Sequence, residues 1–188
     1  MQLVLASASP RRKEICSLLG IDFTVMPASA ELPFDPALTA EENAVAVARA
    51  KAREIADKLG TAVPVLGADT SVILDTEDGT VALGKPVGEE DAFRMLRALQ
   101  GRRHRVLTGV WVCGTDREDG YCDQAFVEFA PMSDDDIRDY IAAGECMDKA
   151  GAYAVQGRCL RYINGIDGDF YTVMGLPSAS LWRFLQQF

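Results

Sequence analysis

The chain has 188 residues, of which 48% are hydrophobic and 25% charged, and its 19 Lys and Arg against 28 Asp and Glu give a formal net charge of −9. This composition is typical of a globular protein, and the length fits a single domain over residues 1–188, built as one body or as two lobes. The negative charge argues against a nucleic-acid coat or a polybasic membrane binder. The single histidine, His104, excludes zinc sites that need two or more imidazoles.

The cysteines and the apolar runs indicate a cytoplasmic protein with no membrane partner. The five cysteines are odd in number and contain no C-x-x-C pair, which predicts reduced thiols in the core. The first residues lack the basic region of a signal peptide, and no apolar run approaches the roughly 18 residues that a membrane span requires.

The first 80 residues alternate between strand and helix patterns. Ser9 is a good N-cap with Pro10 in the first helical position, and Thr39–Glu42 forms a capping box that opens a longer helix. The predicted elements are a strand at 3–6, a helix at 11–19, a strand at 23–26, a loop at 27–38, a helix at 39–59, a strand at 63–68 that 71–74 continues or pairs with, and a turn at 75–80.

The second half adds two long strands in a hairpin. The predicted elements are a helix at 89–99, strands at 105–113 and 121–130 around a turn at 114–120, a helix from 133 to 144, strands at 161–163 and 171–174, and a helix at 181–188. Helices that interleave with strands, some of them antiparallel, predict an α/β fold with a mixed β-sheet and flanking helices.

Two segments at strand ends are candidate sites. Ser7–Lys13 joins a strand to a helix N-terminus and carries three cationic side chains, a combination that favours phosphate but also fits a basic surface turn. Asp69 follows the buried strand at 63–68, at the edge where α/β folds place ligands. Its carboxylate could accept a proton from water, hold a divalent cation, or satisfy N–H groups of its own loop.

Three isolated charges and a glycine-containing segment complete the candidates. Glu31, Lys51 and Lys85 each fit a solvated surface, but together with Asp69 they fit a basic pocket with two carboxylates that binds a triphosphate and its metal. Asp148–Gly157 offers small residues for close backbone approach, and the Gln156 amide can read a nucleobase edge or bond backbone in a packed turn. The single histidine and both tryptophans fit structural roles.

In order along the chain, several short motifs resemble the Maf family, whose members were once described as septum-formation inhibitors and are associated with nucleoside triphosphate pyrophosphatase activity. The matching segments are Leu5–Arg12, Gly67–Thr70, Gly84–Pro86, Gly101–Gly109, Asp148–Tyr153, Gln156–Gly157, Ile166–Gly168 and Val173–Pro177. The resemblance implies two lobes around a central cleft, similar to inosine triphosphate pyrophosphatases. It also implies hydrolysis of a nucleoside triphosphate to the monophosphate and pyrophosphate.

The resemblance also implies a role for each candidate residue. Asp69 matches the general base, and with Glu31 it matches the carboxylates that hold Mg²⁺ or Mn²⁺. Arg11, Thr70 and Gln156 match specificity positions of the version that acts on dTTP and UTP. The residues that match the binders of substrate phosphates are Ser7, Arg11, Arg12, Lys51 and Lys85.

Two departures and two rival functions qualify the resemblance. Cys146 stands where the family commonly has Pro, and Thr172 where Asn is frequent, which leaves the shape of the base pocket open. The rivals are a non-catalytic nucleotide-binding regulator of cell division and a pyrophosphatase for modified purine nucleotides. The expected partner is a small nucleotide rather than nucleic acid, and the family allows a homodimer.

Overall fold

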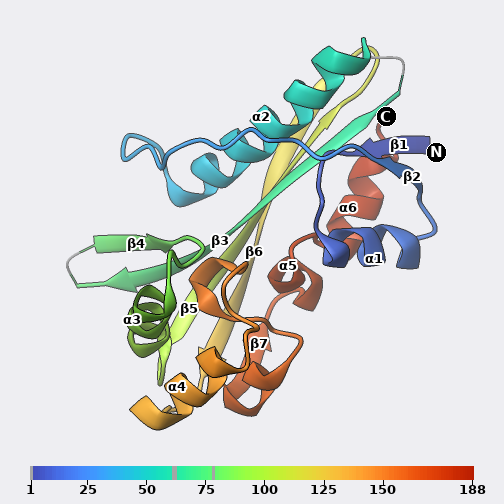
Figure 1. Ribbon diagram of the computed structural model, residues 1–188. Coiled ribbons are helices and arrows are strands. Elements are labelled where there is room, and N and C mark those ends of the chain that lie inside the picture. The colour runs from blue at the N-terminus through green and yellow to red at the C-terminus, as the bar shows by residue number, and fades with distance from the viewer. Residues whose placement is uncertain (1, 61–62, 78) are drawn as a thin grey trace. The chain divides into compact units, whose positions relative to one another are not determined.

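A computed structural model describes residues 2–60, 63–77 and 79–188 and has alternating strands and helices (Figure 1). The strands are β1 (Gln2–Leu5), β2 (Asp22–Val25), β3 (Val65–Thr76), β4 (Gly79–Leu83), β5 (Arg103–Cys113), β6 (Glu118–Phe129) and β7 (Ile163–Asp167). The helices are α1 (Pro10–Leu18), α2 (Ala40–Leu59), α3 (Glu89–Leu99), α4 (Asp134–Ala142), α5 (Phe170–Met174) and α6 (Ser178–Leu185), with short 3-10 helices at Ala150–Ala152 and Arg158–Tyr162.

Within the described residues the strands form a seven-stranded mixed sheet. Its order is β2-β1-β3-β5-β6-β7, and β4 pairs with β3 off this path. Strand β1 runs parallel to both β2 and β3, whereas β3 with β4 and β6 with β7 are antiparallel. The predicted α/β class with a mixed sheet is therefore confirmed.

The chain divides into two compact units. Unit 1 comprises Met1–Thr70, Leu107–Asp123 and Tyr171–Phe188, and unit 2 comprises Ser71–Val106 and Gln124–Phe170. The boundaries fall inside strands β3, β5 and β6, so each of these strands contributes residues to both units. The expectation of two lobes around a cleft stays a prediction.

The helix starts in unit 1 follow the capping signals of the sequence. The Ser9 hydroxyl accepts from the Arg12 amide at 3.5 Å and Pro10 opens α1, as expected. At α2 the capping box is complete, because the Glu42 carboxylate accepts from the Thr39 amide at 2.7 Å and the Thr39 hydroxyl accepts from the Glu42 amide at 3.1 Å. Gly60 ends α2 with a positive φ of 69°, which glycine adopts without strain.

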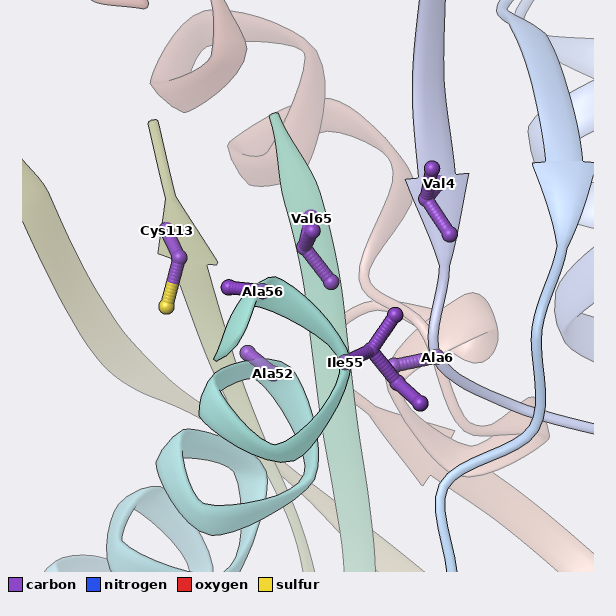
Figure 2. Close-up of a cluster of buried hydrophobic side chains, with 7 residues drawn as sticks. All are labelled: Val4, Ala6, Ala52, Ile55, Ala56, Val65 and Cys113. Carbon is purple, nitrogen blue, oxygen red and sulfur yellow. The ribbon is translucent and has the colours of Figure 1, made fainter. Parts of the chain in front are cut away.

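The core of unit 1 lies where α2 packs on the sheet. Figure 2 shows Ala52, Ile55 and Ala56 of α2 close to side chains of β1, β3 and β5. The buried cluster consists of Val4, Ala6, Ala52, Ile55, Ala56, Val65 and Cys113. The alanines on this face are small, so the helix backbone can approach the strands closely.

Two glycines on the strands make the approach closer still. A Cβ atom on Gly67 of β3 would lie 2.2 Å from the Ala48 carbonyl oxygen, and one on Gly109 of β5 would lie 2.3 Å from the Ala44 carbonyl oxygen. Both contacts are with helix backbone, which cannot rotate away as a flexible side chain can. Glycine is therefore required at both positions for α2 to pack at this distance.

Unit 2 packs around α3, α4 and a buried aromatic cluster. The His104 ring lies edge-on to Phe129 and Tyr153, with centroid distances of 5.1 and 5.5 Å, and its Nε2 hydrogen-bonds the Tyr153 hydroxyl at 2.8 Å. The side chain is only 2% exposed, and this burial lowers the pKa of His104 to about 4. The structural role expected for this histidine is confirmed.

This buried histidine predicts a loss of stability in acid. Below pH 6.5 the unfolded chain protonates His104 while the folded chain stays neutral down to about pH 4, so protonation favours unfolding within this window. We expect the free energy of unfolding to fall by about 2 kcal/mol between pH 7 and pH 5 because of this residue. Urea titrations of the wild type and of His104→Gln, which cannot titrate, isolate the effect. An equal pH slope in both proteins would contradict it.

Three predicted local structures are wrong. The turn expected at 75–80 is shorter, because β3 extends to Thr76 and β4 begins at Gly79; Asp78 of that range lies outside the described residues. Residues 171–174 are helical in α5, where a strand was expected, because a short apolar run fits either element. Of the strand expected at 161–163, only Ile163 lies in a strand, and the two residues before it close a 3-10 helix.

All five cysteines are free, as expected, and four are buried, Cys122 being half-buried. Among the described residues, no helix is both long and apolar enough to cross a membrane.

Candidate active site

The predicted phosphate-binding turn lies between β1 and the N-terminus of α1, in unit 1. Ser7 is 7% exposed, and its hydroxyl oxygen accepts from the Ser9 amide at 3.2 Å. The same oxygen accepts from Arg12 Nη1 at 3.1 Å. The turn is thus held closed by its own side chains, and Arg12 is fixed relative to β1.

Arg12 joins three segments that are distant in the sequence. Beyond its bond to Ser7, its Nε donates to the Gly175 carbonyl oxygen at 2.8 Å and its Nη2 donates to the Thr70 hydroxyl at 3.1 Å. Burial lowers the pKa of Arg12, and the Asp69 carboxylate acts in the opposite direction. The guanidinium therefore also holds the site together, a function that the sequence did not reveal.

The predicted base lies in an ion pair. Asp69 of β3 accepts from Lys51 Nζ of α2, with Oδ1 to Nζ at 2.8 Å, and both side chains are largely buried, at 19% and 12% exposed. Glu31 Oε1 lies 3.5 Å from the same Nζ, but this carboxylate is 73% exposed. The structure therefore brings together three residues that the sequence predicted separately.

These two groups adjoin each other in unit 1. Asp69 and Thr70 are consecutive on β3, so the ion pair and the Arg12 cluster meet at this strand. Arg11 is half-buried on the first turn of α1, and its positive charge lowers the pKa of Arg12. Unit 1 thus carries Ser7, Arg11, Arg12, Glu31, Lys51, Asp69 and Thr70 of the predicted set.

The other two predicted residues belong to unit 2. Lys85 is exposed in the turn after β4, and Gln156 is exposed in the segment before the second 3-10 helix. The Gly151 amide donates to the Gly84 carbonyl oxygen at 3.0 Å, so the lysine turn and the glutamine segment are bonded within this unit. A Cβ on Gly151, whose φ is +67°, would lie 2.9 Å from Val72, so glycine is needed there.

Sequence reasoning missed Thr108, a polar residue that contacts Thr70 in the interior of unit 1. The Thr70 and Thr108 hydroxyl oxygens are 3.1 Å apart, and Thr108 donates to the Thr172 carbonyl oxygen at 2.8 Å. Thr108 and Thr172 are fully buried. Thr108 falls inside a segment that resembles the family, but nothing in its sequence context shows which way its side chain points.

The carboxylates fit a hard divalent cation only with help from a ligand. Among the described residues, no group of three or more His, Cys, Asp or Glu is placed to hold a metal. Asp69 and Glu31 each supply a carboxylate oxygen, 2.8 Å and 3.5 Å from Lys51 Nζ. One or two carboxylates completed by water and substrate phosphates are what Mg²⁺ uses in nucleotide sites, so the donor set fits that cation.

A separate apolar groove of about 590 Å³ lies along another face of α2, in unit 1. Leu32, Val45, Ala46 and Trp111 line it, and none of the predicted site residues does. Beside it Glu118 accepts from Arg53 and Arg49, which lower the pKa of Glu118 to about 2 and tie α2 to the hairpin of β5 and β6.

Comparisons of the sequence with known proteins point to one family. A family model described as "Maf-like protein" matches residues 2–188. A Bacillus velezensis protein named dTTP/UTP pyrophosphatase is 45% identical over 187 residues, covering 100% of this chain and 96% of the relative. A Thermococcus gammatolerans protein of the same name is 46% identical over 96% of this chain and 94% of the relative. The solved Ham1 protein of Staphylococcus aureus is 15% identical and aligns over 100% of this chain and 98% of its own, with a TM-score of 0.49.

Proposed function

Because the chain belongs to the family of Maf-like proteins, we propose that it hydrolyses nucleoside triphosphates, foremost dTTP and UTP, to the monophosphate and pyrophosphate. The observation that carries the proposal is the buried pair of Lys51 and Asp69 next to the cationic turn of Arg11 and Arg12. A fixed carboxylate beside fixed positive charge is what attack of water on a phosphate anhydride requires.

The residues of unit 1 would divide the work between binding and proton transfer. The Ser7–Arg12 turn and Lys51 bind phosphate oxygens, with Lys85 of unit 2 as a further cation. Asp69 takes a proton from the attacking water, whose oxygen bonds to the α phosphorus. The bond from that phosphorus to the bridging oxygen breaks, and pyrophosphate leaves with the bond's electron pair.

Lys51 would link the two tasks. Its ammonium group lies 2.8 Å from Asp69, so it orients the carboxylate before substrate arrives. A triphosphate competes for this positive charge, and the carboxylate then becomes freer to bond water. Mg²⁺ or Mn²⁺, held by Asp69, Glu31 and phosphate oxygens, would supply further positive charge at the phosphates.

Selection of the base would depend on Arg11, Thr70 and Gln156. The Gln156 amide has both a donor and an acceptor, and so matches the O4 and N3–H edge of thymine or uracil. Its exposure in unit 2 leaves its polar atoms available to a ligand. The proposed setting is the cytoplasm, which the five free cysteines support, and the homodimer stays a prediction.

A substrate panel tests the proposal. We expect purified protein with Mn²⁺ to release pyrophosphate from dTTP and UTP at least tenfold faster than from ATP, GTP or methylated and deaminated purine nucleotides. A tenfold difference in rate corresponds to about 1.4 kcal/mol of discrimination between substrates. Gln156→Glu, which replaces an amide donor by an acceptor, should lower kcat/KM for dTTP and UTP by about tenfold.

Other outcomes of the panel separate the rivals. Binding of dTTP without any release of pyrophosphate would favour a non-catalytic regulator. Faster turnover of modified purine nucleotides than of dTTP and UTP would favour a pyrophosphatase for modified purine nucleotides. The matched control is Gln187→Glu, which makes the same change of charge at an exposed glutamine outside the proposed site and should leave turnover unchanged.

A further inference from the structure

A buried line of hydrogen bonds runs from Arg12 into the interior of unit 1. Arg12 Nη2 contacts the Thr70 hydroxyl at 3.1 Å, Thr70 contacts the Thr108 hydroxyl at 3.1 Å, and Thr108 contacts the Thr172 carbonyl oxygen at 2.8 Å. Thr108 is 0% exposed, so water does not compete for its hydroxyl.

The direction of each bond in this line is determined by chemistry. A carbonyl oxygen can only accept, so Thr108 gives its single hydroxyl proton to Thr172. In the contact between the two hydroxyls, Thr70 must therefore be the donor and Thr108 the acceptor. Arg12 can only donate, so the Thr70 oxygen accepts from it.

We infer that Thr108 is a positioning residue that makes Thr70 a hydrogen-bond acceptor toward substrate. The Thr70 proton is directed inward, so the half-buried hydroxyl retains only a lone pair for a ligand. The Gly175 backbone lies close to this hydroxyl on one side, because a Cβ on Gly175 would lie 3.2 Å from the Thr70 oxygen.

This polarity of Thr70 predicts which bases the site prefers. The step rests on the proposed function and on the proposed role of Thr70 in base selection. An acceptor at Thr70 favours a base that carries an N–H group at the contacted ring position, here N3, and disfavours one that carries a lone pair there. Uracil and thymine carry a proton on N3, which would pair with Thr70 while the Gln156 amide N–H pairs with O4. Cytosine has a lone pair on N3 and carries its N–H groups on N4. Thr108 would thus contribute to the preference for UTP over CTP without touching either nucleotide.

A matched pair of variants tests the inference. Thr108→Val keeps the shape of the side chain but removes the hydroxyl, so the Thr70 proton loses its acceptor and can turn toward ligand. Thr108→Ser keeps the hydroxyl. We expect the ratio of kcat/KM for UTP to that for CTP to fall about tenfold in the valine variant and to stay near the wild-type ratio in the serine variant.

A merely structural role would change both substrates alike. An unchanged ratio in Thr108→Val, or equal loss for UTP and CTP, would overturn the inference. Thermal unfolding of both variants shows whether the fold is retained. If valine at 108 prevents folding, Thr108→Cys, which is a weak hydrogen-bond partner of similar size, takes its place, with the same ratio as the readout.

A second measurement does not depend on activity. In NMR spectra of the wild type and Thr108→Ser, the Thr70 hydroxyl proton should be protected from exchange with water, and in Thr108→Val this protection should be lost. An unprotected Thr70 proton in the wild type would overturn the inference. If the protein releases no pyrophosphate from any nucleotide, the proposed function fails, while the hydroxyl polarity is still decided by these spectra.

Discussion

Replacement of Asp69 by asparagine is expected to lower the rate of pyrophosphate release by about 10²- to 10⁴-fold, the usual contribution of a positioned base. Asparagine has nearly the same volume and can still accept a hydrogen bond from Lys51, which lies 2.8 Å away. The fold and the binding of nucleotide should therefore survive, because the cationic residues of the turn are unchanged.

Three measurements on this variant separate chemistry from folding. Pyrophosphate release gives the rate, calorimetry gives the affinity for UTP, and thermal unfolding gives the stability. Asp75→Asn is the matched control, since Asp75 is also an ion-paired aspartate on β3 but is not among the proposed site residues. Turnover of Asp69→Asn near the wild-type rate would remove Asp69 from the role of base, and rescue by high Mn²⁺ would assign it to holding the cation alone.

Replacement of Gly67 by alanine should have the largest effect on stability. The added Cβ would lie 2.2 Å from the Ala48 carbonyl oxygen and 2.8 Å from the Ala52 amide nitrogen, so α2 or β3 must shift. Overpacking of this kind against backbone is expected to cost about 2–4 kcal/mol of unfolding free energy. Urea titration measures the loss directly.

The same substitution should impair the site. Lys51 lies on α2 and Asp69 follows Gly67 by two residues, so a shift of the helix lengthens the 2.8 Å contact between them. Gly165→Ala on β7 is the control, because its Cβ would meet nothing within 4 Å and its φ is not in the left-handed region. Equal stability of the two variants would contradict the close packing of α2.

Much of the fold could be predicted because its signals are local. The caps at Ser9, Thr39 and Ser133 are properties of four consecutive residues, and each begins a helix where expected. Strand β4 was missed because its residues are mostly exposed and lack the alternating apolar pattern. Segment 171–174 was misassigned because four residues, three of them apolar or aromatic, do not distinguish a strand from one helical turn.

The candidate site could be predicted as a set of residues but not as a set of contacts. The segment Gly67–Thr70 identified Asp69, and Lys51 was singled out as an isolated charge. Nothing local shows that these side chains, 18 positions apart, form an ion pair. The bond of Arg12 to Gly175 spans 163 positions, and Thr108 carries no charge that would single it out. Such contacts arise only when distant segments pack together.

The narrow spacing between α2 and the sheet also affects how the results of a mutational scan of this protein should be interpreted. Ala44, Ala48 and Ala52 face the sheet at intervals of four residues, opposite Gly67 and Gly109. Larger side chains at these five positions would lower activity as changes at Asp69 would, although none of the five belongs to the proposed site. A scan that records only activity would therefore report an enlarged site, and one that also records protein abundance would separate the spacer positions from the proposed base.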